Sequence, residues 1–298
     1  MGNGKGHIGN GYKYLFQRIS EEGSFDRFLA WAVFLYRTSH WSLFNSALAY
    51  IQRNGCVCLK SEKDWEKIGR TVKSSATPIV IMQPFGPVTF VYDFADTEGE
   101  NVPIDLQRFN EFIEPPLQPI SEVILGNAKE ICPRLGVKYY ERSMGAGQCG
   151  ESQIRKNRMY YGAKSSKKRK IGWYEIVINS NCNATSKVTT IFHELGHILC
   201  GHLPLDKEKR KENSLKVPDR TDDHLDPSIE EWEAEKVCEV TCRMLGLEYD
   251  SRAYLSEYGY GSLFEKKTGS ARLVLDAADK IIRLLESTKK EKRIDISI

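Results

Sequence analysis

Residues 189–202, TTIFHELGHILCGH, place two histidines four residues apart within the apolar spacing of a helix. This spacing brings both imidazoles to one helix face, about one turn apart, where they can share one ion. Glu194 lies between them on the neighbouring face, where it can take a proton from a metal-activated water. We expect His193 and His197 to be metal ligands and Glu194 to be the catalytic base. An ordinary histidine pair at the surface or in the core is the alternative.

A second predicted helix, residues 229–246, carries carboxylates on the same stripe as core residues. The stripe consists of Glu231, Glu235, Cys238, Cys242 and Leu245. Catalytic zinc needs a third protein ligand, and a buried carboxylate without a partner is costly. We predict that Glu231 is this ligand and that Glu235 accepts the free N–H of a ligating imidazole. Glu235 and Glu233 are the alternative ligands, and otherwise Glu230 and Glu233 belong to an exposed acidic face.

Two further residues of the first motif could reach the same site. Cys200 follows His197 by three residues, but a structural His/Cys site would want two more soft ligands at short spacing. The sequence shows none. We expect His202 to make a local hydrogen bond and not to bind the metal.

The order of strand, His-Glu-x-x-His helix, loop and Glu-x-x-Ala helix resembles the gluzincin metallopeptidases, and most of all the ImmA/IrrE family of bacterial and phage metallopeptidases. HELGH is the usual form in that family, and EWEAEKVC fits its Glu-x-x-Ala-Asn-x-Phe-Ala pattern at Glu231, Ala234 and Glu235. Glu235 in place of Asn or Asp and Cys238 in place of Ala depart from it. The resemblance covers about residues 120–285. It implies a zincin-like fold, one Zn²⁺ per chain, and cleavage of a protein or peptide substrate such as a repressor.

The N-terminal segment alternates cations with aromatic residues, as single-strand nucleic-acid binders do. The cations that we expect to contact nucleic acid are Arg53, Lys67, Arg70 and Lys73, and Lys60 and Lys63 lie among them. The aromatic residues are Trp41, Phe44, Tyr50 and Trp65. Most of them have helical spacing, so a place in the core is the alternative for them.

The same segment resembles the N-terminal domain of ArdC-type antirestriction proteins, a single-stranded-DNA-binding module. The matching positions are Asn45, Gln52, Trp65, Gly69-Arg70, Val72-Lys73, Pro84, Asp93, Thr97 and Gly99. SSAT follows Lys73 where the family has Lys-Gly, which removes a basic turn. The resemblance implies single-stranded DNA as a partner. An antirestriction-type DNA-binding protein with a mainly structural metal site is therefore the alternative function, and an adaptor with a degenerate zincin fold is another.

EPPLQP at 114–119 predicts a linker between two domains, 1–118 and 119–298, in an α+β protein. Residues 12–52 and 61–72 read as helices, residues 77–94 as a hairpin, and residues 270–287 as the last helix. Residues 171–180 read as a strand, and we expect GWYEIVIN to be the edge strand that pairs with an extended substrate.

Composition excludes some classes of function. The net charge of +3 over 298 residues is too small to imply nucleic-acid binding by itself. No apolar run approaches the roughly 18 residues of a membrane helix, and the N-terminus shows no apolar signal segment. Cys56 and Cys58 lack a second pair at zinc-finger spacing. Together these features favour free thiols in a cytoplasmic protein.

Overall fold

The structure is a computed structural model of the whole chain. It describes residues 25–53, 55–83, 88–107, 122–145, 148–156, 172–203, 215, 217–218, 220, 225–247, 249, 251 and 270–295. The fold is mixed α+β and divides into two compact units, Met1–Leu117 and Gln118–Ile298. Their boundary lies one residue before the predicted one. The predicted linker EPPLQP, the PFGP turn and the basic run KSSKKRK lie outside the described residues.

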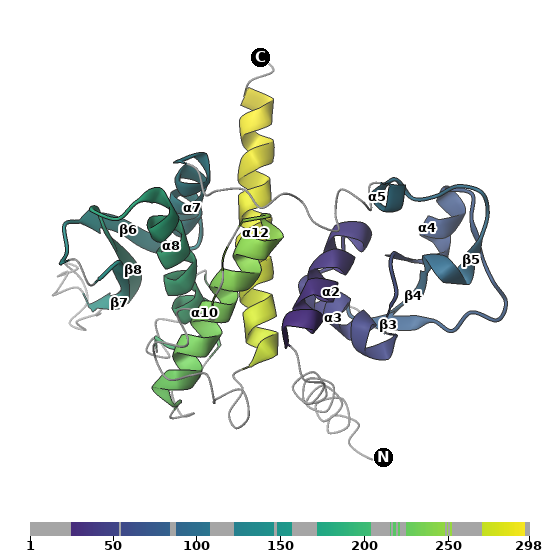
Figure 1. The fold of residues 1–298 in the computed structure, drawn as a ribbon, viewed down its shortest axis with the longest axis horizontal. Coiled ribbons are helices and arrows are strands. Elements are labelled where there is room, and N and C mark those ends of the chain that lie inside the picture. Colours follow the sequence, from purple (N-terminus) through teal and green to yellow (C-terminus); the bar gives the residue numbers. More distant parts are fainter. Residues whose placement is uncertain are drawn as a thin grey trace, which may run out of the picture. The chain divides into compact units, whose positions relative to one another are not determined.

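The first unit combines helices with two small antiparallel sheets (Figure 1). Its helices are α2 (Phe25–Ser39), α3 (Leu43–Gln52), α4 (Glu62–Lys67), the 3₁₀ turn η1 (Phe94–Asp96) and α5 (Ile104–Gln107). Its strands are β1 (Leu59–Lys60), β2 (Thr71–Val72), β3 (Ile79–Ile81), β4 (Thr89–Asp93) and β5 (Thr97–Glu98). The sheet orders are β1-β4-β3 and β2-β5. The predicted hairpin is confirmed, because β3 and β4 pair antiparallel.

Two amide side chains of α3 bind the edge of β3. Asn45 donates to the carbonyl of Met82 and accepts from its N–H. Gln52 makes the same pair of hydrogen bonds with Val80. Each amide therefore imitates one residue of a neighbouring strand, which satisfies backbone groups that an edge strand would otherwise leave open.

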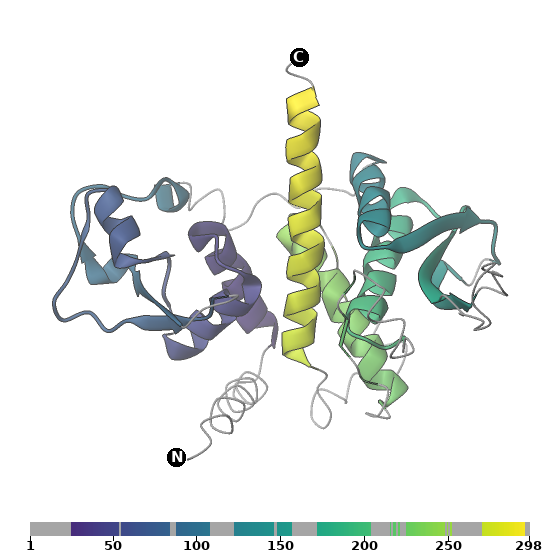
Figure 2. The same cartoon turned by 180° about the vertical axis from the view of Figure 1, so that it is seen from behind.

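The second unit packs helices against a mixed three-stranded sheet. Its elements are α7 (Glu122–Arg134), β6 (Val137–Arg142), β7 (Gly150–Lys156), β8 (Gly172–Asn179), α8 (Ala184–Leu199), α10 (Pro227–Met244) and α12 (Ala271–Asp295). The strand order is β6-β8-β7, with β6 parallel and β7 antiparallel to β8. Helices α8, α10 and α12 lie side by side in both views (Figure 1 and Figure 2).

Strand β8 is the central strand of this sheet, so the prediction that GWYEIVIN forms an edge strand is wrong. Residues 174–179 are all buried. A near-continuous apolar run is typical of a strand covered on both faces, and this signal was present in the sequence. Within the described residues, the edges of the sheet are β6 and β7.

All eight cysteines are free thiols, and six of them are buried. Cys200, Cys238 and Cys242 face the core, as predicted. Cys149 and Cys182 are the accessible pair, and their Sγ atoms lie 3.5 Å apart. In the described part of the chain, no helix is long and apolar enough to span a membrane.

Candidate metal centre

Two capped helices carry the predicted metal ligands. Helix α8 begins after Asn183, whose side chain accepts the N–H of Ser186, and α10 begins after Asp226, which caps Ser228 in the same way. The helices approach closely at Gly196. A Cβ atom there would lie 2.8 Å from the Cα of Ala234, so no larger residue fits without a shift. This contact brings the carboxylates of α10 within reach of the imidazoles of α8.

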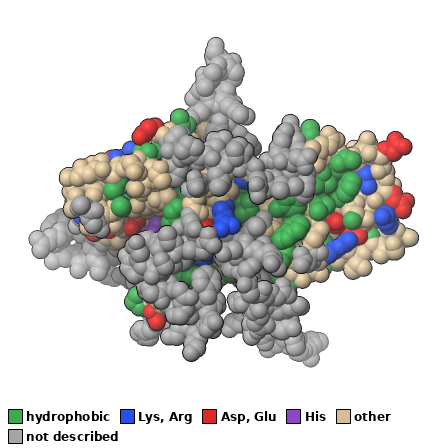
Figure 3. Space-filling view, in the orientation of Figure 1, with side chains coloured by type: hydrophobic (Ala, Val, Ile, Leu, Met, Phe, Trp, Pro, Cys, Tyr) green, Lys and Arg blue, Asp and Glu red, His purple; other side chains and the backbone are tan. Residues whose placement is uncertain are grey.

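The structure brings together the three residues that the sequence predicts as ligands. The Nε2 atoms of His193 and His197 lie 3.1 Å apart. The carboxylate of Glu231 lies 3.4 Å from Nε2 of His193 and 3.5 Å from Nε2 of His197. All three side chains are partly exposed, and a histidine is visible beside acidic side chains on the surface of the second unit (Figure 3). Three ligand atoms thus converge where solvent can reach them.

Glu235 orients His193, as predicted. Its Oε2 lies 3.1 Å from Nδ1 of His193, and the hydroxyl of Tyr249 donates to its other oxygen. The carboxylate can only accept, so Nδ1 of His193 carries a proton, which leaves Nε2 as the nitrogen that can bind a metal ion. Tyr249 was missed, because it follows the α10 helix and no sequence pattern links it to the site.

The arrangement fits a divalent metal ion. Two Nε2 atoms 3.1 Å apart need a proton or another cation between them, and Glu231 adds a negative ligand at the same point. Two imidazoles and one carboxylate suit zinc. Imidazole and carboxylate also bind other divalent metals, so the ligand set suits a divalent metal without selecting zinc.

Electrostatics distinguish the two histidines. Burial lowers the pKa of His193, but hydrogen bonds with Glu231 and Glu235 outweigh it and raise the pKa to about 10. For His197, burial and the charge of His193 lower the pKa to about 3, despite the opposing effect of Glu231. In the metal-free protein the carboxylates therefore hold positive charge at His193, whereas burial and that charge keep His197 neutral.

Glu194 lies beside this triad in a buried position, 8% exposed. Burial raises the pKa of its carboxyl group, partly offset by the charge of His193 and by hydrogen bonds with the hydroxyl and backbone of Ser152. Ser152 belongs to β7, so Glu194 faces the edge strand of the sheet. A carboxylate whose proton affinity is raised next to a metal site can act as a general base.

The structure corrects the prediction that Glu233 belongs to an exposed acidic face. Its side chain is fully buried, and it contacts His202, Arg220 and the backbone N–H of Ser270. Despite burial, these contacts lower the pKa of its carboxyl group. Helix α10 is covered both by α8 and by α12, so its opposite faces are both internal. Glu233 points away from the triad and is not a ligand of it.

All four cations predicted to contact nucleic acid have polar partners within the first unit. Arg53 pairs with Asp96, Lys67 pairs with Asp64, and Lys73 donates to the carbonyl of Ala95. Lys67 is well exposed, with 64% of its side chain accessible.

The fourth cation, Arg70, is only 6% exposed and lies over the ring of Phe94. It donates to Thr97, Gly99 and Asn101. Trp65 and Tyr50 are buried core residues. The aromatic residues of the sequence pattern are thus part of the core at these two positions.

The solvent-facing side of β4 carries two aromatic side chains, Phe90 and Tyr92, that were not among the aromatic residues predicted from the sequence. Phe90 is 53% exposed, and Tyr92 follows on the same face of the strand. Lys60 of β1 pairs directly with Tyr92 in the sheet. The alternation in TFVYD was the signal, since it places two aromatic residues on the face opposite buried Val91. Apolar side chains reach the surface over this unit (Figure 3).

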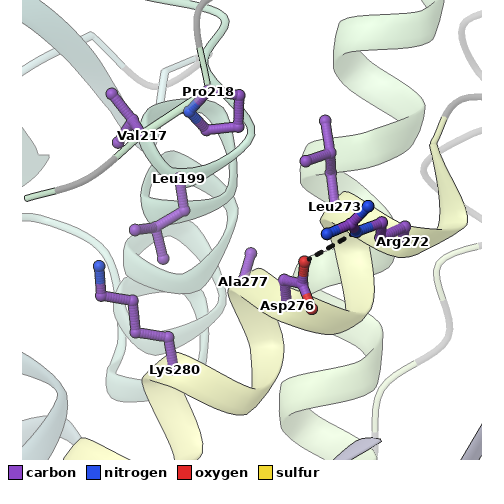
Figure 4. Close-up of a pocket in the computed structure, with 8 residues that line it drawn as sticks. All are labelled: Leu199, Val217, Pro218, Arg272, Leu273, Asp276, Ala277 and Lys280. Carbon is purple, nitrogen blue, oxygen red and sulfur yellow. Dashed lines mark ion pairs between the residues drawn. The ribbon is translucent and has the colours of Figure 1, made fainter. Parts of the chain in front are cut away.

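A separate pocket of about 440 Å³ lies in the second unit (Figure 4). It is lined by Leu199, Val217, Pro218, Arg272, Leu273, Asp276, Ala277 and Lys280. Burial raises the pKa of Asp276 and lowers that of Lys280, and Arg272 pairs with Asp276 at 3.6 Å. None of the triad residues lines this pocket, so it is distinct from the metal centre.

Comparison with known proteins gives structural likeness only. No protein-family model and no curated protein matches the sequence. The chain is similar to the metal-free crystal structure of the antirestriction protein ArdC from plasmid R388, with 14% identity and a TM-score of 0.38 over 91% of this chain and 96% of that one. The Mn(II)-bound ArdC structure gives 16% identity and a TM-score of 0.41 over 93% and 97%. These values are too low to support an argument about function.

Proposed function

We propose that the second unit is a metal-dependent peptidase. The observation that carries the proposal is the convergence of two imidazole Nε2 atoms and the Glu231 carboxylate beside the buried Glu194. A purely structural metal site has no need of a general base, whereas hydrolysis requires one.

The proposed roles follow from the contacts. His193, His197 and Glu231 hold Zn²⁺, which when bound supplies Lewis-acid chemistry. Glu194 accepts a proton from the water that attacks the scissile carbonyl, and it delivers that proton to the leaving amine. Burial of Glu194 supports this role, because a raised proton affinity lets the carboxylate take up the proton.

We propose that an extended substrate pairs with the outer edge of β7, and not with β8 as the sequence suggests. Strand β7 pairs with β8 on one side and has no strand partner among described residues on the other. Ser152 of β7 lies beside Glu194, so a peptide added to this edge would pass the general base.

The decisive experiment compares Glu194→Gln with the parent protein. Elemental analysis would measure bound metal, and a peptide library would measure cleavage, with and without single-stranded DNA. We expect about one zinc in both proteins and cleavage only by the parent, with a fall of about 10²- to 10⁴-fold on loss of the base. Glu122→Gln on the exposed surface of α7 is the matched control. Metal in both with cleavage in neither would refute the peptidase.

A second candidate function is binding of single-stranded DNA by the first unit, with a mainly structural metal site in the second. The exposed Phe90 and the half-buried Tyr92 beside Lys60 favour it, because single-strand binders stack bases on aromatic side chains next to cations. Fluorescence anisotropy with a labelled oligonucleotide would test it. Phe90→Ala should weaken binding by about 1–3 kcal/mol. Equal affinity of variant and parent would refute the role of this face.

A further inference from the structure

A buried polar chain lies directly behind His197. Nδ1 of His202 is 2.9 Å from Nδ1 of His197, and Nε2 of His202 is 2.8 Å from Oε2 of Glu233. Arg220 donates to the same oxygen of Glu233, and the N–H of Ser270 donates to the other oxygen. The side chains of His202 and Glu233 are 1% and 0% exposed. Water therefore does not compete for these contacts.

The hydrogen bonds among Glu233, His202 and His197 determine which nitrogen of His197 carries the proton. Glu233 already receives hydrogen bonds from a guanidinium and a backbone N–H, so it acts as an acceptor towards His202. Nε2 of a neutral His202 then carries its single proton, and its Nδ1 has the lone pair. Two ring nitrogens at 2.9 Å need one proton between them, which His197 must supply from Nδ1. Nε2 of His197 is left without a proton and faces Glu231.

The same residues could be read as a second metal site, since Cys200, His202 and Glu233 lie close enough to share an ion. The contacts speak against this reading. Both nitrogens of His202 are engaged, and the Arg220 cation occupies the approach to Glu233.

We propose that His202, Glu233 and Arg220 are positioning residues that hold His197 in the tautomer with Nδ1 protonated and direct its Nε2 to the metal. This inference rests on the proposed metal centre. The two imidazoles then have separate supports: Glu235 with Tyr249 for His193, and this chain for His197. Helix α10 supplies the ligand Glu231, and it also supplies one carboxylate to each support: Glu235 for His193 and Glu233 for His202.

The test replaces His202 in the full-length protein and measures zinc affinity by competition with a chromophoric chelator. His202→Leu removes the acceptor behind His197, and we expect the dissociation constant to rise about 10- to 100-fold, as for other partners of metal-bound histidines. His202→Asn returns an oxygen acceptor close to the Nδ1 position, and its affinity should lie between those of the parent and the leucine variant. Glu230→Gln is the control, because Glu230 lies on the same helix but takes no part in these hydrogen bonds, and this variant should bind zinc like the parent.

A second readout does not depend on activity or on metal. Long-range ¹H–¹⁵N spectra of the metal-free, histidine-labelled protein report which nitrogen of His197 carries the proton. We expect the Nδ1–H form in the parent and in Glu235→Gln, and loss of this preference in His202→Leu. If His202→Leu does not fold by circular dichroism, Arg220→Gln provides the same test with a smaller expected rise in the dissociation constant.

The outcomes separate the two proposals. If the zinc affinity and the tautomer of His197 are unchanged in His202→Leu, the positioning role of His202, Glu233 and Arg220 is refuted. The proposed metal centre would be unaffected by that result. Two zinc ions per protein molecule, one of which is lost in Cys200→Ser, would refute the positioning role in favour of a second metal site. A parent protein that binds no zinc would refute the metal centre, and the tautomer in the metal-free protein would still decide whether the chain orients His197.

Discussion

The two units both bury charged side chains, but they satisfy them differently. In the first unit, the N–H donors of Arg70 meet the oxygens of Thr97, Gly99 and Asn101 at 2.5–3.0 Å. In the second unit, Nε2 of His193, Nε2 of His197 and the carboxylate of Glu231 converge, and these three groups share at most one proton. Burial of charge alone therefore does not mark a functional site. A mismatch between donors and acceptors does, because something else must satisfy it.

The most severe test of this contrast removes a ligand. Glu231→Gln should weaken zinc binding by more than about 1,000-fold, since even outer partners of metal ligands contribute 10- to 100-fold. Chelator competition measures the effect, with Glu230→Gln as control. Near-parental affinity in Glu231→Gln would show that another carboxylate completes the site.

Helix α10 also contains a matched ion pair, which should behave like Arg70. Lys236 lies 2.6 Å from Glu239 and 3.0 Å from the hydroxyl of Ser251, and both ionic side chains are buried. Lys236→Met should lower the free energy of unfolding by about 3 kcal/mol, the low end for a broken buried pair because Arg243 still contacts Glu239.

Urea unfolding of the metal-free protein measures this loss, and zinc affinity should change less than about twofold. The double variant Lys236→Met, Glu239→Leu should recover part of the stability, since apolar replacement of both partners removes the buried charge. A large loss of zinc affinity in Lys236→Met would break the distinction between matched and mismatched groups.

Arg70→Met should destabilise the first unit by about 2 kcal/mol, because several oxygens lose charged donors. Hydrogen exchange across residues 59–98 would locate the effect, and zinc binding should remain unchanged. The opposite result, unchanged exchange with weaker binding of single-stranded DNA, would return Arg70 to the DNA-contacting role that the sequence suggests.

The smallest expected effect belongs to the accessible lysines. If the first unit binds single-stranded DNA, Lys67→Gln with Lys73→Gln should lower the salt slope of log K by about 1.4, or 0.7 for each phosphate contact. The affinity loss should be about tenfold or less at physiological salt, without a change in stability. An unchanged slope would exclude both lysines from the interface.

What could be predicted from the sequence was mostly local. The four-residue spacing of His193 and His197 and the stripe through Glu231 and Glu235 depend on the helix period, so the convergence of these residues was foreseeable. Ser61 caps α4 through the N–H of Asp64, and such a cap likewise depends only on residues close in sequence.

Other misses depend on long-range packing. The placement of Glu233 was missed because α10 has two covered faces, and a single helix pattern does not show how many neighbours a helix has. Strand order was missed for the same reason, since β7 joins β8 from a separate segment. Arg70 read as a surface cation because its oxygen partners lie 27–31 residues away in the sequence.

The close contact between Gly196 and Ala234 means that the distance between α8 and α10 at the metal centre is set by backbone atoms. The ligands on α8 and α10 are held apart by the thickness of a glycine against Ala234 and not by their own side chains. A methyl group added there would act as a wedge and enlarge the aperture between imidazoles and carboxylate without changing any ligand. The spacing of the two imidazoles and the Glu231 carboxylate thus depends on a residue that contributes none of these groups.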